Sequence, residues 1–538
     1  MNSTFLKTQK AILNKRLLAK IHLKISSLLD VGGYNARPYS VNLDLQEGLR
    51  EQSLKGIWRW WARAAVSGAL GGKLHMNKID EKISNIFGST NFASKISISM
   101  QPFINQSYQQ SIEQLLKTID EFIKDVKTFF KTEARNILRK YDRKIQSCNI
   151  KISPVEPKIA FESKHRFDTS DIKTIVQIVK SSKSLEKWID EKELTNLEKN
   201  RRGHSKKKVN IPLDIRVSIS GHSISLKRYC QIPRVKISLM PTKTESDTIK
   251  IDNVDSIKVE RYVNRIKEEL VALIQDESEC LLELYNNIRM SSDEVCFAIS
   301  TLLLSLMLGG VGSSTGRGFG ALNITKIEMP DNIRLKMPKD LIEIIDKVNK
   351  LNEKSCVDLQ DLEEFFEELV EKAVKFAGKI LGKVEHITEM PEIPSLDPNF
   401  TYFRLKVVPC FKTRLEVLHA IGNATLKQEW KKIAGMSIKA SGRFLHTWIL
   451  GLPRKQKGRG YLSKINRRQS AIRMTVKKYS SKYFIVLYGF LSKDWPDDLK
   501  HIGEIKSNIK VGDTNIRAAF DYAFSTMLKI LGKYCGRS

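Results

Sequence analysis

The sequence lacks any long hydrophobic run, and no apolar stretch approaches the roughly 20 residues that a membrane-spanning helix requires. Residues 1–20 carry basic side chains, but they contain no continuous apolar segment and no small-residue cleavage site, so they do not resemble a signal peptide. We therefore expect no membrane partner and a cytoplasmic location.

Cysteine and histidine are scarce and dispersed. The 7 cysteines include no CxxC pair, and the 9 histidines include no HExxH motif. The missing CxxC pair excludes a zinc ribbon, and the scattered spacing argues against a disulfide framework. We expect no metal, no cofactor and a reducing compartment. The cysteines are Cys148, Cys230, Cys280, Cys296, Cys356, Cys410 and Cys535.

Acidic residues are also few: the chain has 60 Asp and Glu against 91 Lys and Arg, which gives a formal net charge of +31. The chain of 538 residues is 41% hydrophobic, which supports real cores and two to four domains rather than disorder. Such a basic surplus favours a polyanionic partner, either nucleic acid or an anionic membrane surface, and we expect nucleic acid. The alternatives are simple solubility and adaptation to high temperature.

Residues 53–70, SLKGIWRWWARAAVSGAL, predict an amphipathic helix. Lys55, Arg59 and Arg63 recur every four residues on the polar side, and Trp60 flanks this basic stripe. An indole beside guanidinium groups suits stacked bases and phosphates, so these four residues are candidate RNA-binding residues. The alternative is a core helix with a solvated charged face. The apolar arc holds Ile57, Trp58, Trp61, Ala62, Ala64, Ala65 and Ala69.

Hydrophobic periodicity predicts alternating strands and helices along the chain. Expected strands cover 18–27, 95–102, 158–163, 211–220, 234–239, 403–408, 444–450, 473–478 and 483–490. Expected helices cover 53–70, 78–87, 112–145, 185–197, 259–288, 293–308, most of 341–384, 416–434 and a last helix capped by Asp513 or Thr514.

Two β-α-β-β-α-like series in this order predict an α+β protein with two ferredoxin-like (RRM-like, split βαβ) domains and helical insertions. We expect an N-terminal domain over 1–330 that carries a helical insertion at about 105–210. A helical connector over 331–398 and a C-terminal domain over 399–538 follow.

A glycine-rich loop follows the apolar helix 293–308. It contains no GK[ST], and its helix–loop–strand order differs from a Rossmann fingerprint, so neither familiar nucleotide loop is present. Glycines still let a polyanionic backbone approach main-chain N–H groups, and Arg317 supplies the loop's one cation. The alternative is a tight structural turn. The glycines are Gly309, Gly310, Gly312, Gly316, Gly318 and Gly320.

A second basic stretch, 453–473, contains no acidic residue. We interpret it as a glycine-containing loop that joins two strands of a ferredoxin-like unit and clamps RNA; the alternative is a solvated face. Its candidate RNA-binding residues are Arg454, Lys455, Arg459, Arg467 and Arg468.

Three stretches in this order, SLKGIWRWWARA, FGSTNFASKISIS and GGVGSSTGRGFGAL, resemble the signature set of the RAMP proteins of CRISPR–Cas systems. Gly32, Gly33, Tyr34 and Asn35 match a GGYN-like loop of the same set. The resemblance is closest to the group that forms the first subunit of the Cmr complex, the type III-B RNA-targeting effector, and HTWILGLPRK with RRQSAIRMTV resembles its second domain more weakly.

This resemblance implies two ferredoxin-like domains and no catalysis by the chain itself. It implies a role in antiviral defence, with CRISPR guide RNA, target RNA and other Cmr subunits as partners, near the guide 3′ region and the guide–target duplex. One departure matters: where relatives often carry an arginine pair in the glycine loop, this chain has Ser313, Ser314 and Thr315.

Two other functions remain open. A RAMP endoribonuclease would use Asp30, in the loop after the first strand, or a histidine such as His446, although His446 also fits a packed position. An architectural subunit would contact RNA only within the assembly.

Overall fold

The computed structural model describes most of the chain. The described residues are 16–27, 51–100, 106–133, 147–152, 158–189, 191, 194–195, 197, 206–214, 216–219, 222–225, 245–251, 254–261, 279–312, 314–437, 443–452, 454–456, 459–463, 467–502 and 507–536. The chain divides into two compact units. Unit 1 contains 1–104 and 275–538, and unit 2 contains 105–274, so the insertion extends well beyond its expected end near 210.

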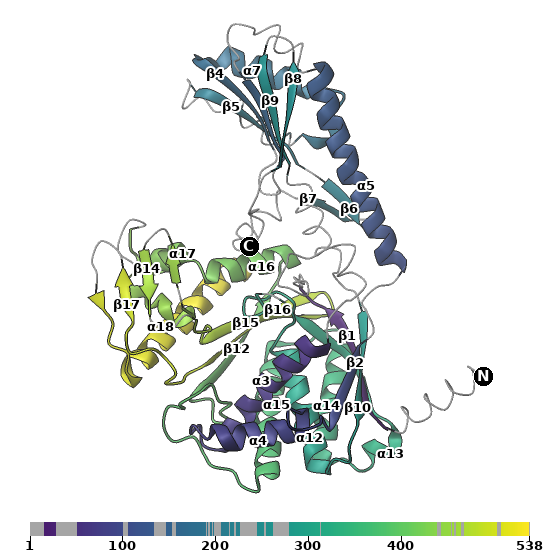
Figure 1. Cartoon of the computed structure of the whole chain (residues 1–538), viewed down its shortest axis with the longest axis vertical. Helices are drawn as coiled ribbons and strands as arrows, with labels where there is room; N and C mark the ends of the chain where they lie inside the picture. Colours follow the sequence, from purple (N-terminus) through teal and green to yellow (C-terminus); the bar gives the residue numbers. More distant parts are fainter. Residues whose placement is uncertain are drawn as a thin grey trace, which may run out of the picture. The chain divides into compact units, whose positions relative to one another are not determined.

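The first half of unit 1 contains an antiparallel four-stranded sheet with the strand order β11-β1-β10-β2. Strands β1, β2 and β10 of this sheet are labelled in Figure 1. The strands are β1 (Leu17–Ile25), β2 (Ile96–Met100), β10 (Glu279–Asn286) and β11 (Leu322–Glu328). In β1, Ile21, Leu23 and Ile25 are buried, while the alternate residues Lys20 and Lys24 pair with Glu283 and Glu279 of β10. This alternation directs one face of the sheet to the core.

Helices pack together over this sheet, with contacts joining α3, α12 and α15 to one another (Figure 1). They are α3 (Glu51–Ala69), α4 (Met76–Phe87), α12 (Ser292–Met307), α13 (Asp331–Arg334), α14 (Lys339–Glu353) and α15 (Leu359–Leu381). Helix α12 starts at a capping box between Ser291 and Glu294 and is buried on nearly every side. Helices α14 and α15, within the expected helical connector 331–398, share this hydrophobic core.

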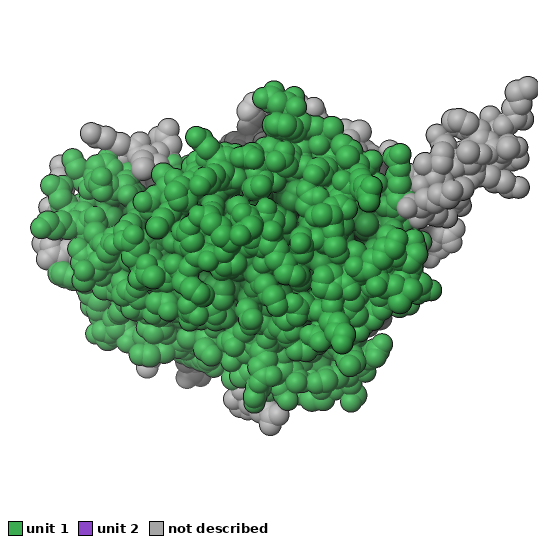
Figure 2. Space-filling model, turned by 90° about the horizontal axis from the view of Figure 1, so that it is seen from below, with its two compact units in different colours: residues 1–104, 275–538 green, residues 105–274 purple. Residues whose placement is uncertain are grey.

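The second half of unit 1 is built on a three-stranded antiparallel sheet in the order β12-β16-β15. Phe484 and Val486 of β16 point into the core shared with α3, whereas Ile485 and Leu487 point into a second core. The strands are β12 (Phe403–Cys410), β15 (Ile472–Tyr479) and β16 (Lys482–Phe490). The second core also contains α16 (Arg414–Ala424), α17 (Lys427–Ile433) and α18 (Asp513–Cys535). The visible face of unit 1 is a continuous surface (Figure 2).

The basic stretch 453–473 is not the interstrand loop expected from the sequence. Its first part forms the hairpin β13–β14 within a separate four-stranded sheet in the order β13-β14-β17-β18, and its last two residues begin β15. The strands are β13 (Arg454–Gln456), β14 (Arg459–Leu462), β17 (Lys500–Ile502) and β18 (Ser507–Asn508).

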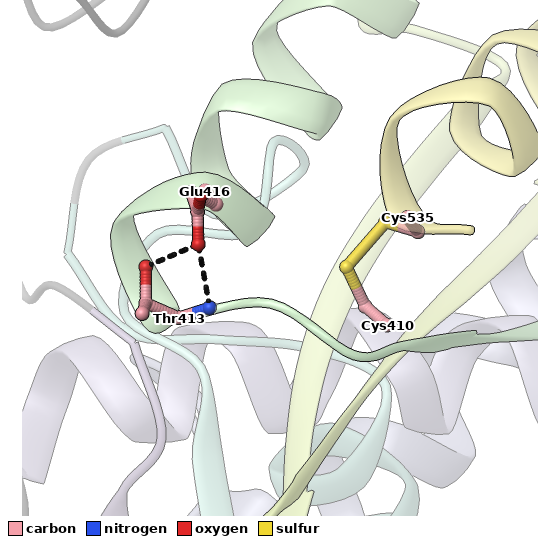
Figure 3. The surroundings of a disulfide bond; sticks show 4 residues. All are labelled: Cys410, Thr413, Glu416 and Cys535. Atoms are coloured by element: carbon pink, nitrogen blue, oxygen red, sulfur yellow. Dashed lines mark hydrogen bonds between the residues drawn. A yellow bond between two sulfur atoms is a disulfide. The ribbon is translucent and has the colours of Figure 1, made fainter. Parts of the chain in front are cut away.

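A disulfide joins Cys410, at the end of β12, to Cys535, at the end of α18, with a Cα–Cα distance of 4.5 Å (Figure 3). The sequence argument against disulfides was wrong at this pair, since 125 residues separate two cysteines that the fold brings together. Close by, Thr413 and Glu416 form the capping box that starts α16. The bridge therefore fixes the chain just before a helix start.

Unit 2 contains a five-stranded sheet in the order β5-β4-β3-β9-β8, antiparallel except between β3 and β9, and the hairpin β6-β7. Trp188 is buried against Phe122 and donates to Asp125 Oδ2 at 3.0 Å. The strands are β3 (Ser147–Ile152), β4 (Lys158–Phe167), β5 (Lys206–Pro212), β6 (Arg216–Ile219), β7 (His222–Ser225), β8 (Glu245–Ile251) and β9 (Val254–Arg261). The helices are α5 (Gln106–Thr128), its π-helical end η1 (Phe129–Glu133), α7 (Thr169–Lys180) and the 3₁₀ turn η2 (Glu186–Trp188).

Several expected elements are wrong. The expected helix 259–288 contains the end of β9 and all of β10, and the expected strand 444–450 forms the 3₁₀ turns η3 (Arg443–Leu445) and η4 (Thr447–Leu450). A break after Ala424 divides 416–434 into α16 and α17. The N-cap of α18 is Gly512, not Asp513 or Thr514. At 259–288 and 444–450, local periodicity gave way to tertiary packing or strand pairing.

Two further expected elements are only partly right. The expected strand 211–220 is divided between β5 and β6, and 185–197 begins with η2 and a bridge at Ile189 rather than a helix. The expected strand 234–239 and the part of the long helix beyond Glu133 lie outside the described residues.

Candidate nucleic-acid interface

The buried face of α3 fixes the orientation of the whole helix. Trp58 is fully buried, and its indole N–H donates to Ala298 O at 3.1 Å and Thr301 Oγ1 at 2.9 Å of α12. Trp61 is also buried. These contacts set which side of α3 carries the basic stripe, and they confirm the predicted helix and its apolar arc.

Helix α4 packs beside the basic stripe of α3 and supplies partners to it. The Arg59 guanidinium donates to the carbonyls of Phe87 and Gly88, at 2.5 and 2.7 Å, at the C-terminal end of α4. Arg63 Nε lies 3.3 Å from Asp80 Oδ1 of the same helix. These cations therefore stabilise the α3–α4 contact, and a backbone carbonyl at a helix C-terminus is a favourable acceptor for a guanidinium.

Lys55, the first residue of the stripe, is half-buried, and its Nζ lies 3.5 Å from Ser94 Oγ. Burial, and secondarily the charge of Arg59, lowers the pKa of the Lys55 ammonium group. The RNA-binding role of Lys55, Arg59 and Arg63 remains a prediction.

Trp60 lies on the other flank of α3. Its ring is half-buried and meets Trp61 and Phe490 edge-on, with centroid distances of 5.3 and 5.2 Å. The Arg473 guanidinium of β15 lies over the indole, 4.5 Å from the ring centroid. This is a planar cation on an aromatic face, an arrangement that suits a nucleobase and its phosphate.

Sequence reasoning counted Arg473 among the cations of the basic stretch 453–473 but did not select it as a candidate RNA-binding residue. The alternation of β15 places Ile472 and Met474 in the core and Arg473 on the opposite side, next to α3. The strand pattern was visible in the sequence, but its neighbour Trp60 is more than 400 positions earlier, so no local signal pointed to the pair.

The glycine-rich loop packs directly on β15. Met474 N–H donates to Gly316 O at 3.0 Å, and Gly318 N–H donates to Met474 O at 2.9 Å. A Cβ on Gly320, where φ is +62°, would lie 1.8 Å from Val311 O. The loop is therefore a tight turn at these positions, which is the alternative that the sequence analysis gave for it. Only glycine fits position 320.

The loop also meets the Trp60–Arg473 stack. A Cβ on Gly316 would lie 3.4 Å from Arg473 Cγ, so Gly316 is in close contact with the arginine that covers Trp60. Gly312 and Ser314 are exposed at the end of the turn, and Ser313 lies outside the described residues.

Arg317 follows Gly316 and forms a backbone bridge with Met474. Its half-buried guanidinium makes no side-chain hydrogen bond or ion pair within the described part of the chain, and burial lowers its pKa. Arg454 donates to Thr425 O at 2.8 Å. Burial, followed by the charge of Arg317, lowers the pKa of Arg454 to about 10. The two arginines are thus close enough for their charges to interact.

The other cations of the basic stretch differ in their partners. Arg468 Nη2 lies 2.7 Å from Asp494 Oδ1, and its guanidinium covers Trp495 at 4.4 Å. Arg467 is exposed. Lys455 lies on β13 and Arg459 on β14, where Lys455 pairs with Gly460 and Arg459 with Gln456. The carboxylate that pairs with Arg468 is outside 453–473, so the sequence argument about missing acids did not apply to it.

Lys477 is a further cation on β15, and it is fully buried. Its Nζ donates to Leu306 O at 3.1 Å, near the end of α12, and to Leu322 O of β11. Burial lowers the pKa of Lys477 to about 7. Lys477 of β15, in the second half of unit 1, therefore donates hydrogen bonds to main-chain carbonyls of α12 and β11 in the first half.

Of the two nuclease candidates named from the sequence, the structure describes only His446. Asp30 and the loop of Gly32, Gly33, Tyr34 and Asn35 lie outside the described residues. His446 has a positive φ of 47° and packs edge-on against Tyr522, and burial lowers its imidazole pKa. Within the described ranges no group of three metal-ligating side chains gathers, and no helix has the length and apolarity to cross a membrane.

A sequence profile of the RAMP superfamily matches residues 49–323, just over half of the chain. Over 372 residues the chain is 25% identical to the CRISPR system CMR subunit Cmr1 of Saccharolobus solfataricus (strain ATCC 35092 / DSM 1617 / JCM 11322 / P2). That match covers 63% of this chain and 62% of the relative's own length.

Two solved structures are also similar. A chain of the cryo-EM structure of the Type III-B Cmr-beta bound to cognate target RNA has 17% identity and a TM-score of 0.45, and the match covers 95% of this chain and all of that one. The apo crystal structure of Cmr1 from Pyrococcus furiosus has 14% identity and a TM-score of 0.38, with 95% and 96% covered.

Proposed function

Because this chain belongs to the RAMP superfamily, we propose that it is a non-catalytic, RNA-binding subunit of a type III-B CRISPR effector complex. Its partners are CRISPR guide RNA, target RNA and other Cmr subunits. The relative named above is itself a Cmr subunit, which supports this assembly. The contact region is the guide 3′ part, its duplex with target RNA, or both.

One observation carries the RNA-binding role: the Arg473 guanidinium covers the half-buried Trp60 ring, and the glycine-rich loop lies against Arg473. Aromatic rings, planar cations and accessible backbone N–H groups together bind single strands with little sequence preference. A net charge of +31 adds long-range attraction for a polyanion.

The proposed interface therefore contains Trp60, Arg473 and the exposed end of the glycine-rich loop. It leaves out Arg59, whose guanidinium donates to two backbone carbonyls of α4, and Arg468, which forms an ion pair with Asp494. Arg473 donates to the neutral Gln469 Oε1 and has no carboxylate partner within the described residues.

The strand order of the first sheet favours a ferredoxin-like domain. In chain order the four strands are β1, β2, β10 and β11. Across the sheet they lie in the order β11, β1, β10, β2, which is the fourth, first, third and second strand of the chain, and helices follow the first and third strands. The sheet β12-β16-β15 has the same arrangement, because its first, third and second strands in chain order lie side by side. No fourth strand joins it within the described residues. We propose two ferredoxin-like domains, the second one abbreviated.

A cytoplasmic location agrees with this function. Disulfides are rare in the cytosol of mesophiles but common in hyperthermophiles, so the state of the Cys410–Cys535 pair there depends on the host. Trapping the free thiols in protein quenched directly from cells measures whether this disulfide is intact.

The function is tested by titrating labelled guide RNA and guide–target duplex with the full chain, followed by co-purification with Cmr subunits. Salt-dependent RNA binding together with stable co-purification supports the proposal. Metal-dependent cleavage of the RNA that Asp30→Ala abolishes would instead establish an endoribonuclease. Co-purification without any RNA binding would establish the architectural alternative.

A further inference from the structure

A group of cations lies where the glycine-rich loop meets α16 and the start of α17. A Cβ on Gly318 would lie 2.6 Å from Ile421 Cδ1, so the loop rests on α16. Thr425 is the C-cap of α16, one turn beyond Ile421, and its carbonyl accepts from Arg454 at 2.8 Å. The fold thus brings Arg317 and Arg454 to the same end of α16.

Lys427, the first residue of α17, extends this group. It is half-buried, and burial, followed by the charges of Lys431 and Arg454, lowers the pKa of its ammonium group. Arg317, Arg454 and Lys427, which we call the α16 cation group, come from three separate segments of the chain.

No carboxylate neutralises the α16 cation group within the described residues, where none of its three members forms an ion pair. The nearest acid in sequence, Glu429, is engaged elsewhere: Oε1 lies 2.5 Å from Lys432 Nζ and Oε2 accepts from Tyr534 at 3.0 Å. Three partly buried cations with no counter-charge among the described residues repel one another. An anion that enters the group offsets this repulsion.

We propose that Arg317, Arg454 and Lys427 bind a phosphodiester group of the RNA backbone. This site deepens the proposed function and rests on it. Guanidinium groups hold phosphate oxygens through paired N–H donors, and an ammonium group adds a point charge. Arg317 adjoins Gly316, which touches Arg473, so the phosphate site is one residue removed from the Trp60–Arg473 stack. The stack receives a base and the α16 cation group a nearby phosphate.

The test measures binding of fluorescein-labelled single-stranded RNA to the full chain by anisotropy across a series of salt concentrations. The slope of log K against log salt is negative. For Arg317→Gln and Arg454→Gln, each lost phosphate contact reduces the magnitude of this slope by about 0.7. At ~0.15 M salt the same slope change weakens binding about fourfold. Arg454→Lys, which keeps the charge, restores most of the slope.

Two controls separate charge from structure. Arg334→Gln removes a cation that is paired bidentately with Asp346, at 2.8 and 2.9 Å, and it leaves the slope unchanged. RNA with an uncharged methylphosphonate backbone binds wild type and Arg317→Gln equally. If Arg454→Gln unfolds, Arg317→Gln alone decides the test, because its side chain has no protein acceptor among the described residues.

An unchanged slope in folded Arg317→Gln, with tight RNA binding by wild type, overturns the phosphate site and leaves the proposed function standing. Absence of RNA binding by wild type overturns both. A slope that falls equally in Arg334→Gln shows a general charge effect and also overturns the site.

Discussion

Helix α3 and strand β15 each carry three cations, yet the two elements use them differently. Arg59 and Arg63 of α3 meet carbonyl and carboxylate oxygens of α4. Arg473 of β15 covers an aromatic ring, and Lys477 is buried on backbone carbonyls. The neighbouring element, rather than the charge pattern, decides whether a cation is available to a ligand.

The largest expected effect concerns Lys477, whose pKa in the folded protein is about 7 against 10.5 for an ordinary lysine. Between these values the unfolded state binds more protons, so stability rises with pH over this window and levels off on either side. The gain is on the order of 5 kcal/mol. Lys477→Met removes this gain. Urea unfolding at neutral and alkaline pH measures the free energy of unfolding that shows the loss.

Lys478→Met, a neighbour on the same strand that is not fully buried, is the matched control. It should keep the wild-type dependence of stability on pH. Parallel pH curves for wild type and Lys477→Met would show that Lys477 is not the source of the change.

Arg59 provides the next largest effect. Arg59→Met keeps the apolar stem but leaves the carbonyls of Phe87 and Gly88 without their donor, which should reduce the free energy of unfolding by about 2–3 kcal/mol. The salt slope of RNA binding should stay at its wild-type value, because this guanidinium is committed to α4. A slope lowered by about 0.7 would return Arg59 to the RNA interface.

Trp60 tests the other side of the comparison. Trp60→Ala should weaken single-stranded RNA binding roughly tenfold, about 1.4 kcal/mol, because a base loses its stacking surface and Arg473 loses its support. Trp60→Phe, which retains a smaller ring, should recover part of the affinity. Equal affinity for wild type, Trp60→Phe and Trp60→Ala would remove stacking from the proposed function.

Arg63 should give the smallest effect. Its side chain and that of Asp80 are about half exposed, at 46% and 48%, so solvent screens the ion pair. Arg63→Ala should change the free energy of unfolding by less than about 0.5 kcal/mol. A loss comparable with that of Arg59→Met would mean that the α3–α4 contact depends on this pair.

Sequence periodicity predicted the elements whose apolar pattern is strong and local. The helices α3, α4 and α12 and the hairpin β15–β16 fall where the pattern placed them. It failed at 259–288, because a charged, alternating strand such as β10 also satisfies much of a helical pattern and is identified only by its partners β1 and β2.

The candidate site was predicted less well, for the same physical reason. Trp60 and Arg317 were selected from local composition, but their neighbours Arg473 and Arg454 belong to segments far along the chain. The partners that occupy Arg59 and Arg468 are equally remote in sequence. Counter-charges are a property of tertiary packing, so a basic run cannot reveal which of its cations are already neutralised.

The sheet β12-β16-β15 has consequences for how this chain can be divided. Because successive residues of β16 enter two different hydrophobic cores, the sheet is an inner wall common to both halves of unit 1. A fragment that ends before β12 would expose the apolar surface of α3 and α15, and a fragment that begins there would expose Phe403, Tyr488 and Phe490. Gene truncations at this junction should therefore yield insoluble halves that recover solubility only when the two are produced together.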